Sequence, residues 1–102
     1  MNIGEHISGA LQQEVPKALQ EYVQTIIEFQ DLCRQFCLRI FENLAKALDI
    51  DEDWFVARHD RQKGTSGTLL RLLYYPKVLE IEDGIDIRAG AHSDFGSVTV
   101  EQ

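Results

Sequence analysis

Apolar residues recur every three or four positions between Pro16 and Leu48, which is the spacing of one stripe along an α-helix. Neither Gly nor Pro interrupts the chain from 17 to 48, and Pro16 suits the first turn of a helix, where its missing N–H needs no partner. The pattern predicts a helix of about 33 residues, roughly 50 Å long. The rest of a small chain cannot cover such a helix, so we expect it to bend or to pack on a larger partner surface.

The sequence predicts mainly loops on either side of this helix. Residues 1–13 are polar and carry two glycines, so we expect a loop or a frayed turn in which His6 is solvated. After the helix, Asp51 is expected to cap a short helix, with Trp54 and Phe55 in the core. Residues 56–67 form a predicted connecting loop, and His59 within it is expected to be a solvated loop histidine rather than a metal ligand.

Strand signals begin after Gly67. The run from Leu69 to Tyr75 is apolar and aromatic and is bounded by Pro76, which predicts a strand. Residues 78–82 are expected to form a short strand or an extended connection, 83–84 a turn, and 85–89 an extended approach to the region around 92. After Gly96, the alternating run 97–100 predicts the start of another strand.

The composition and charge of the chain limit the partners and the cellular location that we expect for it. The chain has 102 residues, enough for one domain, and its net charge of −7 comes without a Lys/Arg cluster. Binding to nucleic acids or to anionic membranes is therefore not expected. We find no signal-peptide pattern and no apolar run of membrane-spanning length, so a cytoplasmic location is expected. Cys33 and Cys37 are interpreted as buried thiols in a reducing compartment.

A His-x-Asp triplet near the carboxyl end contains the candidate metal-binding residues. If residues 91–94 are extended, His92 and Asp94 point to the same face of the strand and can both bind one cation. An imidazole and a carboxylate are two of the three ligands in the 2-His-1-carboxylate triad of non-heme Fe(II) sites. The triplet alone is a weak signal, because a His and an Asp also occur together at a strand end that leads into a turn.

The flanking residues strengthen the interpretation. The segment Arg88–Thr99 resembles the iron-binding segment of the isopenicillin N synthase-like family of Fe(II)/2-oxoglutarate dioxygenases, and Leu69–Pro76 resembles that family's strand ending in Tyr-Pro. The resemblance implies that His92 and Asp94 bind Fe(II), that Tyr75 contacts the co-substrate 2-oxoglutarate, and that the parent enzyme oxidises a small molecule with O₂.

The resemblance also implies an α+β fold, in which the long helix packs as a scaffold on a partial double-stranded β-helix (jelly-roll) sheet, an incomplete barrel. Residues 1–66 would be the helical segment that supports the barrel, and residues 67–102 the N-terminal part of a truncated dioxygenase domain. The exposed strand edges of such a sheet favour self-association.

The chain lacks some residues of the family pattern and differs from it at others. The family's second iron-binding histidine and its Arg-x-Ser would lie beyond Gln102, Leu73 stands where plant members often carry Asn, and Val100–Gln102 differs from the usual Leu-Leu-Phe-Gln. We therefore expect a truncated, weakly active or inactive chain. The alternatives are a non-catalytic helical interaction or dimerisation protein, and a Zn hydrolase, which would need further His or Cys ligands.

Overall fold

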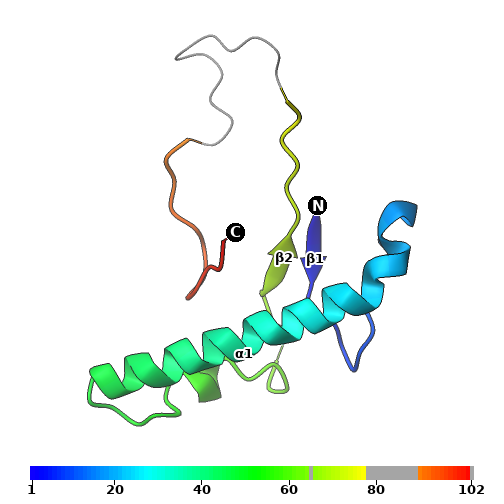
Figure 1. Cartoon of the computed structure of the whole chain (residues 1–102). Helices are drawn as coiled ribbons and strands as arrows, with labels where there is room; N and C mark the ends of the chain where they lie inside the picture. Colours follow the sequence, from blue (N-terminus) through cyan, green and yellow to red (C-terminus); the bar gives the residue numbers. More distant parts are fainter. Residues whose placement is uncertain (65, 78–89, 102) are drawn as a thin grey trace.

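A computed structural model describes residues 1–64, 66–77 and 90–101. The order of elements is strand β1 (Asn2–Gly4), 3₁₀-helix η1 (Lys17–Tyr22), helix α1 (Val23–Ala47), 3₁₀-helix η2 (Val56–Arg58) and strand β2 (Leu69–Arg71). Figure 1 shows α1 as the element along which the other parts are arranged. The expectations for 78–82, for the turn at 83–84 and for 85–89 lie outside the described residues.

The helical prediction for 16–48 is confirmed in location, with a change of helix type near its start. Tyr22 leaves helical geometry with φ −101° and ψ 5°, so the tight helix η1 meets α1 at an angle. This bend is visible at the blue end of the helix in Figure 1. A bend is one of the two alternatives that the sequence left open, the other being a helix that packs on a larger partner surface.

Helix α1 ends in a Schellman motif built on an aspartate. The N–H of Ile50 donates to the carbonyl of Ala45 at 3.1 Å, and the N–H of Asp49 donates to that of Lys46 at 3.2 Å. Asp49 holds the left-handed position between them with φ 55°, which Asp tolerates better than most residues. The last carbonyls of the helix are thus satisfied without a glycine.

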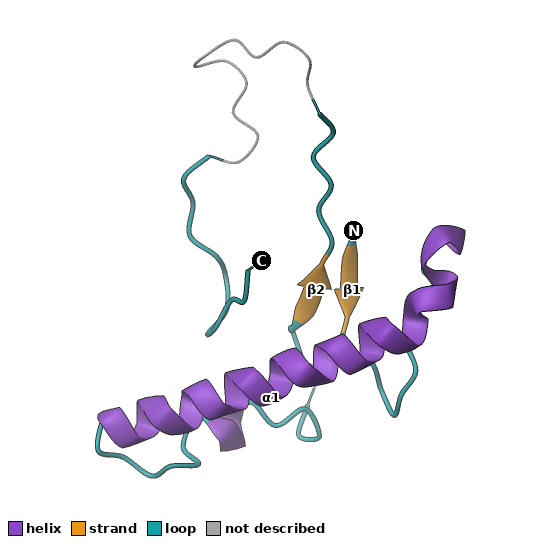
Figure 2. Ribbon diagram, in the orientation of Figure 1, coloured by secondary structure: helices purple, strands orange, loops and turns teal. Residues whose placement is uncertain are grey.

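Strands β1 and β2 form a two-stranded antiparallel sheet, with Ile3 opposite Leu70 (Figure 2). The expectation of a loop over the first thirteen residues is therefore wrong for Asn2–Gly4. The strand expected over Leu69–Tyr75 is assigned only as far as Arg71, because β1 offers just three residues to pair with. Two backbone hydrogen bonds between Met1 and Leu72, of 2.7 and 2.8 Å, extend the pairing of the two strands by one residue in each.

The apolar core is small. Among the described residues it consists of five buried side chains: Ile3, Ile26, Ile27, Phe41 and Ala45. The radius of gyration is 17.3 Å, whereas a compact domain of this length has one of roughly 13 Å. The described residues contain one long helix and the two-stranded sheet, so the jelly-roll sheet stays a prediction.

The aromatic residues after α1 are only partly buried. Phe55 is half-buried and packs near Phe41 with ring centroids 6.0 Å apart, so it lies at the border of the core rather than inside it. Trp54 is 40% exposed, so its assignment to the core is wrong. The guanidinium of Arg58 lies 3.6 Å from the centre of its ring, and this cation–π contact covers a face that the core does not. The expectation that Asp51 caps a short helix is wrong, because η2 has Phe55 at its N-cap position and no side-chain hydrogen bond caps it.

Polar side chains of α1 hold the N-terminal segment in place. Gln30 donates to the carbonyl of Gly4 at 2.9 Å and accepts from the N–H of His6 at 3.3 Å. Asp31 accepts from Nε2 of His6 at 2.9 Å and from Arg61 at 3.3 Å. His6 is only 7% exposed, so the expectation of a solvated histidine is wrong. Its burial follows from pairing with α1, a contact between residues far apart in the sequence.

We expect the His6–Asp31–Arg61 contact to make stability fall in acid. The hydrogen bond from His6, supported by the charges of His6 and Arg61, holds the pKa of Asp31 below its usual 3.8. A carboxylate whose folded pKa is lowered stabilises the fold above its unfolded pKa, and this contribution disappears as the pH falls through the folded value. Asp31→Asn should therefore lower the free energy of unfolding at pH 6, with a difference from the wild type that shrinks below about pH 4.

Urea denaturation across this pH range measures the effect. Glu28→Gln, which removes an acidic group three positions earlier on the same helix, is the matched control and should keep the pH profile of the wild type. A constant difference between Asp31→Asn and the wild type from pH 6 to pH 3 would show that the carboxylate charge contributes nothing.

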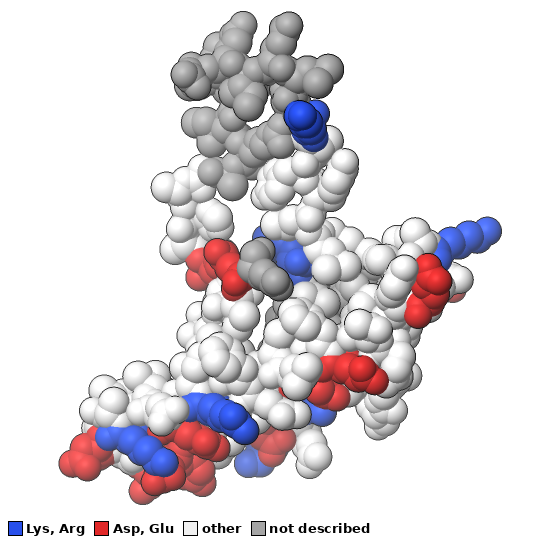
Figure 3. All heavy atoms as spheres, viewed as in Figure 1, with Lys and Arg blue, Asp and Glu red and all other residues white. Residues whose placement is uncertain are grey.

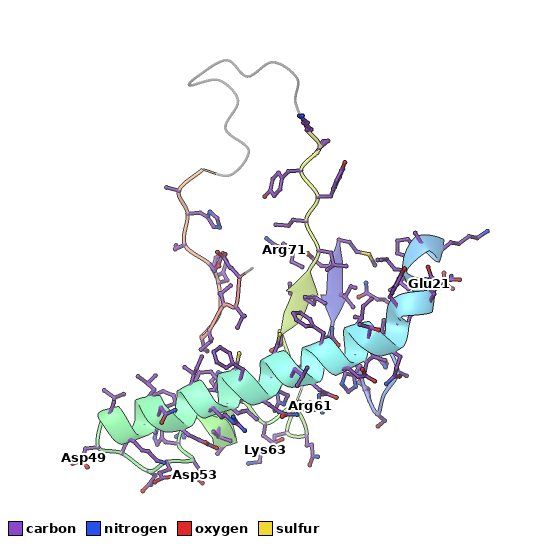
Figure 4. The ribbon with its side chains drawn as sticks, in the orientation of Figure 1. Glu21, Asp49, Asp53, Arg61, Lys63 and Arg71 are labelled. Carbon is purple, nitrogen blue, oxygen red and sulfur yellow. The ribbon has the colours of Figure 1, made fainter. Side chains whose placement is uncertain are left out.

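Charged side chains of both signs mix along α1 and the loops beside it. On the face drawn in Figure 3, basic and acidic groups alternate over the helix, and no broad basic surface is visible. Arg61 and Lys63 project from the loop beside α1, whereas Arg71 lies at the sheet (Figure 4). Cys33 and Cys37 are free, partly buried thiols. Within the described ranges, no helix combines the length and apolarity needed to cross a bilayer.

Candidate metal centre

His92 and Asp94 lie together at the surface of the C-terminal segment, residues 90–101. Nε2 of His92 is 3.3 Å from Oδ1 of Asp94. The two side chains therefore share a face, as the alternation argument required. The strand expected over 97–100 is not formed, because no other described segment pairs its backbone with this one. The pair thus lies on an irregular segment rather than on a strand of a sheet.

A backbone carbonyl fixes the tautomer of His92. Nδ1 donates its hydrogen to the carbonyl of Gly90 at 2.9 Å, so in the neutral ring Nε2 is the nitrogen with a free lone pair, and in the protonated ring Nε2 donates to Oδ1 of Asp94. Metal-binding histidines commonly have this arrangement, with the second ring nitrogen bonded to a carbonyl or carboxylate. The Gly90 carbonyl, followed by the Asp94 and Glu101 carboxylates, raises the pKa of His92 above its usual 6.5.

Glu101 brings a third donor to this pair. One donor atom from each of His92, Asp94 and Glu101 lies within 4.8 Å of the other two, and all three residues are exposed. Bonds of about 2.0–2.2 Å place two ligands of one cation roughly 3 Å apart when they meet at right angles, close to the His92–Asp94 separation. Imidazole and carboxylate donors fit Fe(II), as in the 2-His-1-carboxylate sites. Glu101 was not predicted as a ligand, although its carboxylate follows directly on the alternating run 97–100.

Tyr75 lies apart from this cluster. It follows β2 in the extended stretch 72–77 and is 48% exposed, next to Tyr74, which is 86% exposed. Figure 1 draws this stretch (yellow) well separated from the C-terminal segment (orange to red). The structure therefore brings His92 and Asp94 together but does not bring Tyr75 to them.

His59 is a further residue that contacts the C-terminal segment. Its ring stacks on Phe41 with centroids 4.2 Å apart, and its Nε2 lies 2.9 Å from the hydroxyl of Ser97. The expectation of a solvated loop histidine is therefore wrong. The physical reason is the aromatic surface of Phe41, which provides a packing site for the ring that the local sequence does not reveal.

Two curated proteins match the chain over most of its length. A UPF0676 protein from Schizosaccharomyces pombe is 32% identical over 87 residues, covering 80% of this chain and 25% of that protein. The 2-oxoglutarate-dependent dioxygenase gloF from Glarea lozoyensis is 28% identical over 72 residues, covering 71% of this chain and 21% of that protein. The chain spans about a quarter of the length of these relatives.

Other comparisons give no match: no family model matches the chain, and no solved structure matches it significantly. The match to gloF shows a distant homology to a 2-oxoglutarate-dependent dioxygenase, and with it an oxidoreductase relationship at the level of the superfamily.

Proposed function

We propose that this chain is part of a non-heme Fe(II)/2-oxoglutarate-dependent oxygenase of the isopenicillin N synthase-like family, and that it acts on a small molecule. The observation that carries the proposal is the His92–Asp94 pair, with Nε2 and Oδ1 3.3 Å apart, in a chain homologous to a 2-oxoglutarate-dependent dioxygenase. His92 and Asp94 are the proposed iron ligands. Tyr75 is the proposed contact for 2-oxoglutarate, a role that rests on the resemblance of Leu69–Pro76 to the family's Tyr-Pro strand.

Each residue has a defined part in this proposal. The Gly90 carbonyl holds the Nδ1 hydrogen of His92, so that Nε2 is the nitrogen offered to a cation. Asp94 supplies a negative oxygen beside it, and together they leave other coordination positions open. When bound, Fe(II) with 2-oxoglutarate and O₂ would supply the oxidising chemistry that hydroxylates, desaturates or cyclises a substrate. The protein supplies orientation and charge.

Binding of Mn(II) to the intact chain tests the proposed ligands, with Mn(II) as a stable substitute for Fe(II). We expect weak, saturable binding, because the ligands lie on an exposed segment. His92→Ala and Asp94→Asn should each weaken it by at least about tenfold, the lower end of what even outer partners of metal ligands contribute. Electron paramagnetic resonance of free Mn(II) during a titration measures the affinity.

Asp53→Asn is the matched control, since it removes an exposed carboxylate from the turn after α1 (Figure 4) and should leave the affinity unchanged. Equal affinities for the wild type, His92→Ala and Asp94→Asn would contradict the proposal. We also expect little succinate from residues 1–102 with Fe(II) and 2-oxoglutarate, because iron held this weakly is rarely in place.

The exposed apolar residues of α1 favour a second candidate, a non-catalytic helical protein that binds a second copy of itself. Five large side chains of the helix region are 43–63% exposed, namely Phe29, Leu32, Phe36, Leu44 and Leu48. Sedimentation equilibrium distinguishes the two candidates. A stable dimer that is unchanged in His92→Ala, together with the absence of Mn(II) binding, would favour this second function.

A further inference from the structure

His59 is attached firmly to the helical part of the molecule. Its ring stacks on Phe41, a core residue of α1 that is 5% exposed, at an interplanar angle of 29°. Its Nδ1 lies 2.8 Å from the carbonyl of Phe55, and its own carbonyl accepts from Arg34 of α1 at 2.9 Å. Stacking, a side-chain bond and a main-chain bond together fix both the position and the orientation of the ring.

These contacts also determine which ring nitrogen faces the C-terminal segment. A carbonyl can only accept, so Nδ1 of His59 carries the hydrogen that is donated to Phe55. In the neutral ring Nε2 is then an acceptor, and the hydroxyl of Ser97 donates to it at 2.9 Å. The bond joins two residues that are far apart in the sequence and belong to different parts of the chain.

Ser97 lies between the candidate ligands, after Asp94 and before Glu101. Within residues 90–101, the neighbouring Val98 is the only residue that is not exposed. The segment therefore meets the rest of the described chain mainly around 97–98. In Figure 1 the orange and red trace descends to the green half of α1. A contact at this point limits how far His92 and Asp94 move relative to the helix.

We propose that His59 is a positioning residue, which holds the metal-binding segment against α1 through its hydrogen bond from Ser97. The role of this segment in binding a metal rests on the proposed function; its attachment by His59 does not. His59 itself is no ligand in this proposal. It acts through Ser97, and its effect is to keep the ligand segment in one place.

The attachment can be measured in the metal-free chain. We expect backbone amide order parameters of about 0.8 for residues 92–98 in the wild type, falling below about 0.6 in Ser97→Ala and in His59→Phe. His59→Phe keeps an aromatic ring on Phe41 and removes both nitrogens. Ser97→Ala removes only an exposed hydroxyl, so it should leave the helical circular dichroism signal and the denaturation midpoint unchanged.

Conservative and control variants separate attachment from general disorder. Ser97→Thr keeps the hydroxyl and should restore the high order parameters. Thr99→Ala removes the other hydroxyl that follows Asp94 in this segment and should change nothing. Order parameters that are the same in the wild type, Ser97→Ala and His59→Phe would overturn the proposal, whatever the metal affinity.

The Mn(II) titration then connects attachment to metal binding. Ser97→Ala and His59→Phe should weaken Mn(II) binding roughly two- to tenfold, as expected for the loss of one neutral hydrogen bond. Failure of the proposed function gives a different result: His92→Ala would bind Mn(II) as the wild type does, while the order parameters still respond to Ser97→Ala. The two proposals can therefore fail separately.

Discussion

Phe41→Ala should lower the free energy of unfolding by about 3–5 kcal/mol, as truncation of a buried phenylalanine typically does. Phe41 is 5% exposed, and its ring touches two others, with centroids 4.2 Å from His59 and 6.0 Å from Phe55. Removing the ring leaves a cavity and takes away the surface on which the segment after α1 packs. Domains are stable by only about 5–15 kcal/mol, so this one change should remove a large fraction of the stability of the chain.

Urea denaturation followed by circular dichroism measures this effect. Phe36→Ala is the matched control, because Phe36 lies on the same helix but is 53% exposed, and it should cost less than about 1 kcal/mol. Equal losses for the two variants would mean that Phe41 contributes through helix formation alone and that the stacked cluster adds nothing.

The helix was predictable because its signal is local and repeated. Its apolar stripe extends over many turns, so a few exceptions do not hide the period. Its end near Leu48 was also predicted, although the left-handed position after it is held by Asp49, where Gly is the usual signal. A bend was one of two alternatives for so long a helix, and no residue in the apolar stripe indicates that it would occur at Tyr22.

Strand β1 and the two histidines His6 and His59 were predicted wrongly for one shared reason. Each is defined by partners distant in the chain: β1 by β2, His6 by Asp31, and His59 by Phe41 and Ser97. A three-residue strand has no period to detect, and a lone histidine in a polar stretch looks solvated. Local patterns do not carry information about such contacts.

The proximity of the His92 and Asp94 side chains was predictable because residues i and i+2 are close in the chain and can meet without a sheet, whereas their role as metal ligands stays a prediction. His92 and Asp94 needed no long-range contact to meet. Tyr75 did need one, since its proposed role requires the stretch 72–77 to approach the C-terminal segment. Its role therefore stays a prediction.

Ile3→Ala should be the second most damaging change, with a cost of about 2–5 kcal/mol. Ile3 is fully buried, and it pairs with Leu70 in the two-stranded sheet. An isolated pair of strands is only marginally stable in water, so the sheet depends on this buried side chain and on the hydrogen bond from Gln30 of α1 to the carbonyl of Gly4. Denaturation, together with amide hydrogen exchange at Leu70 and Leu72, should show lower stability and faster exchange.

Ile7→Ala is the control for this variant, since Ile7 is 62% exposed and the same substitution there should change stability by no more than about 0.5 kcal/mol. If Ile3→Ala left exchange at Leu72 unchanged, the pairing of Met1 with Leu72 would not depend on the buried isoleucine. Loss of that pairing in Ile3→Ala would instead show that the N-terminal strand fixes the start of the stretch that carries Tyr75. The N-terminal residues would then contribute to the placement of a proposed co-substrate contact that lies far from them in the sequence.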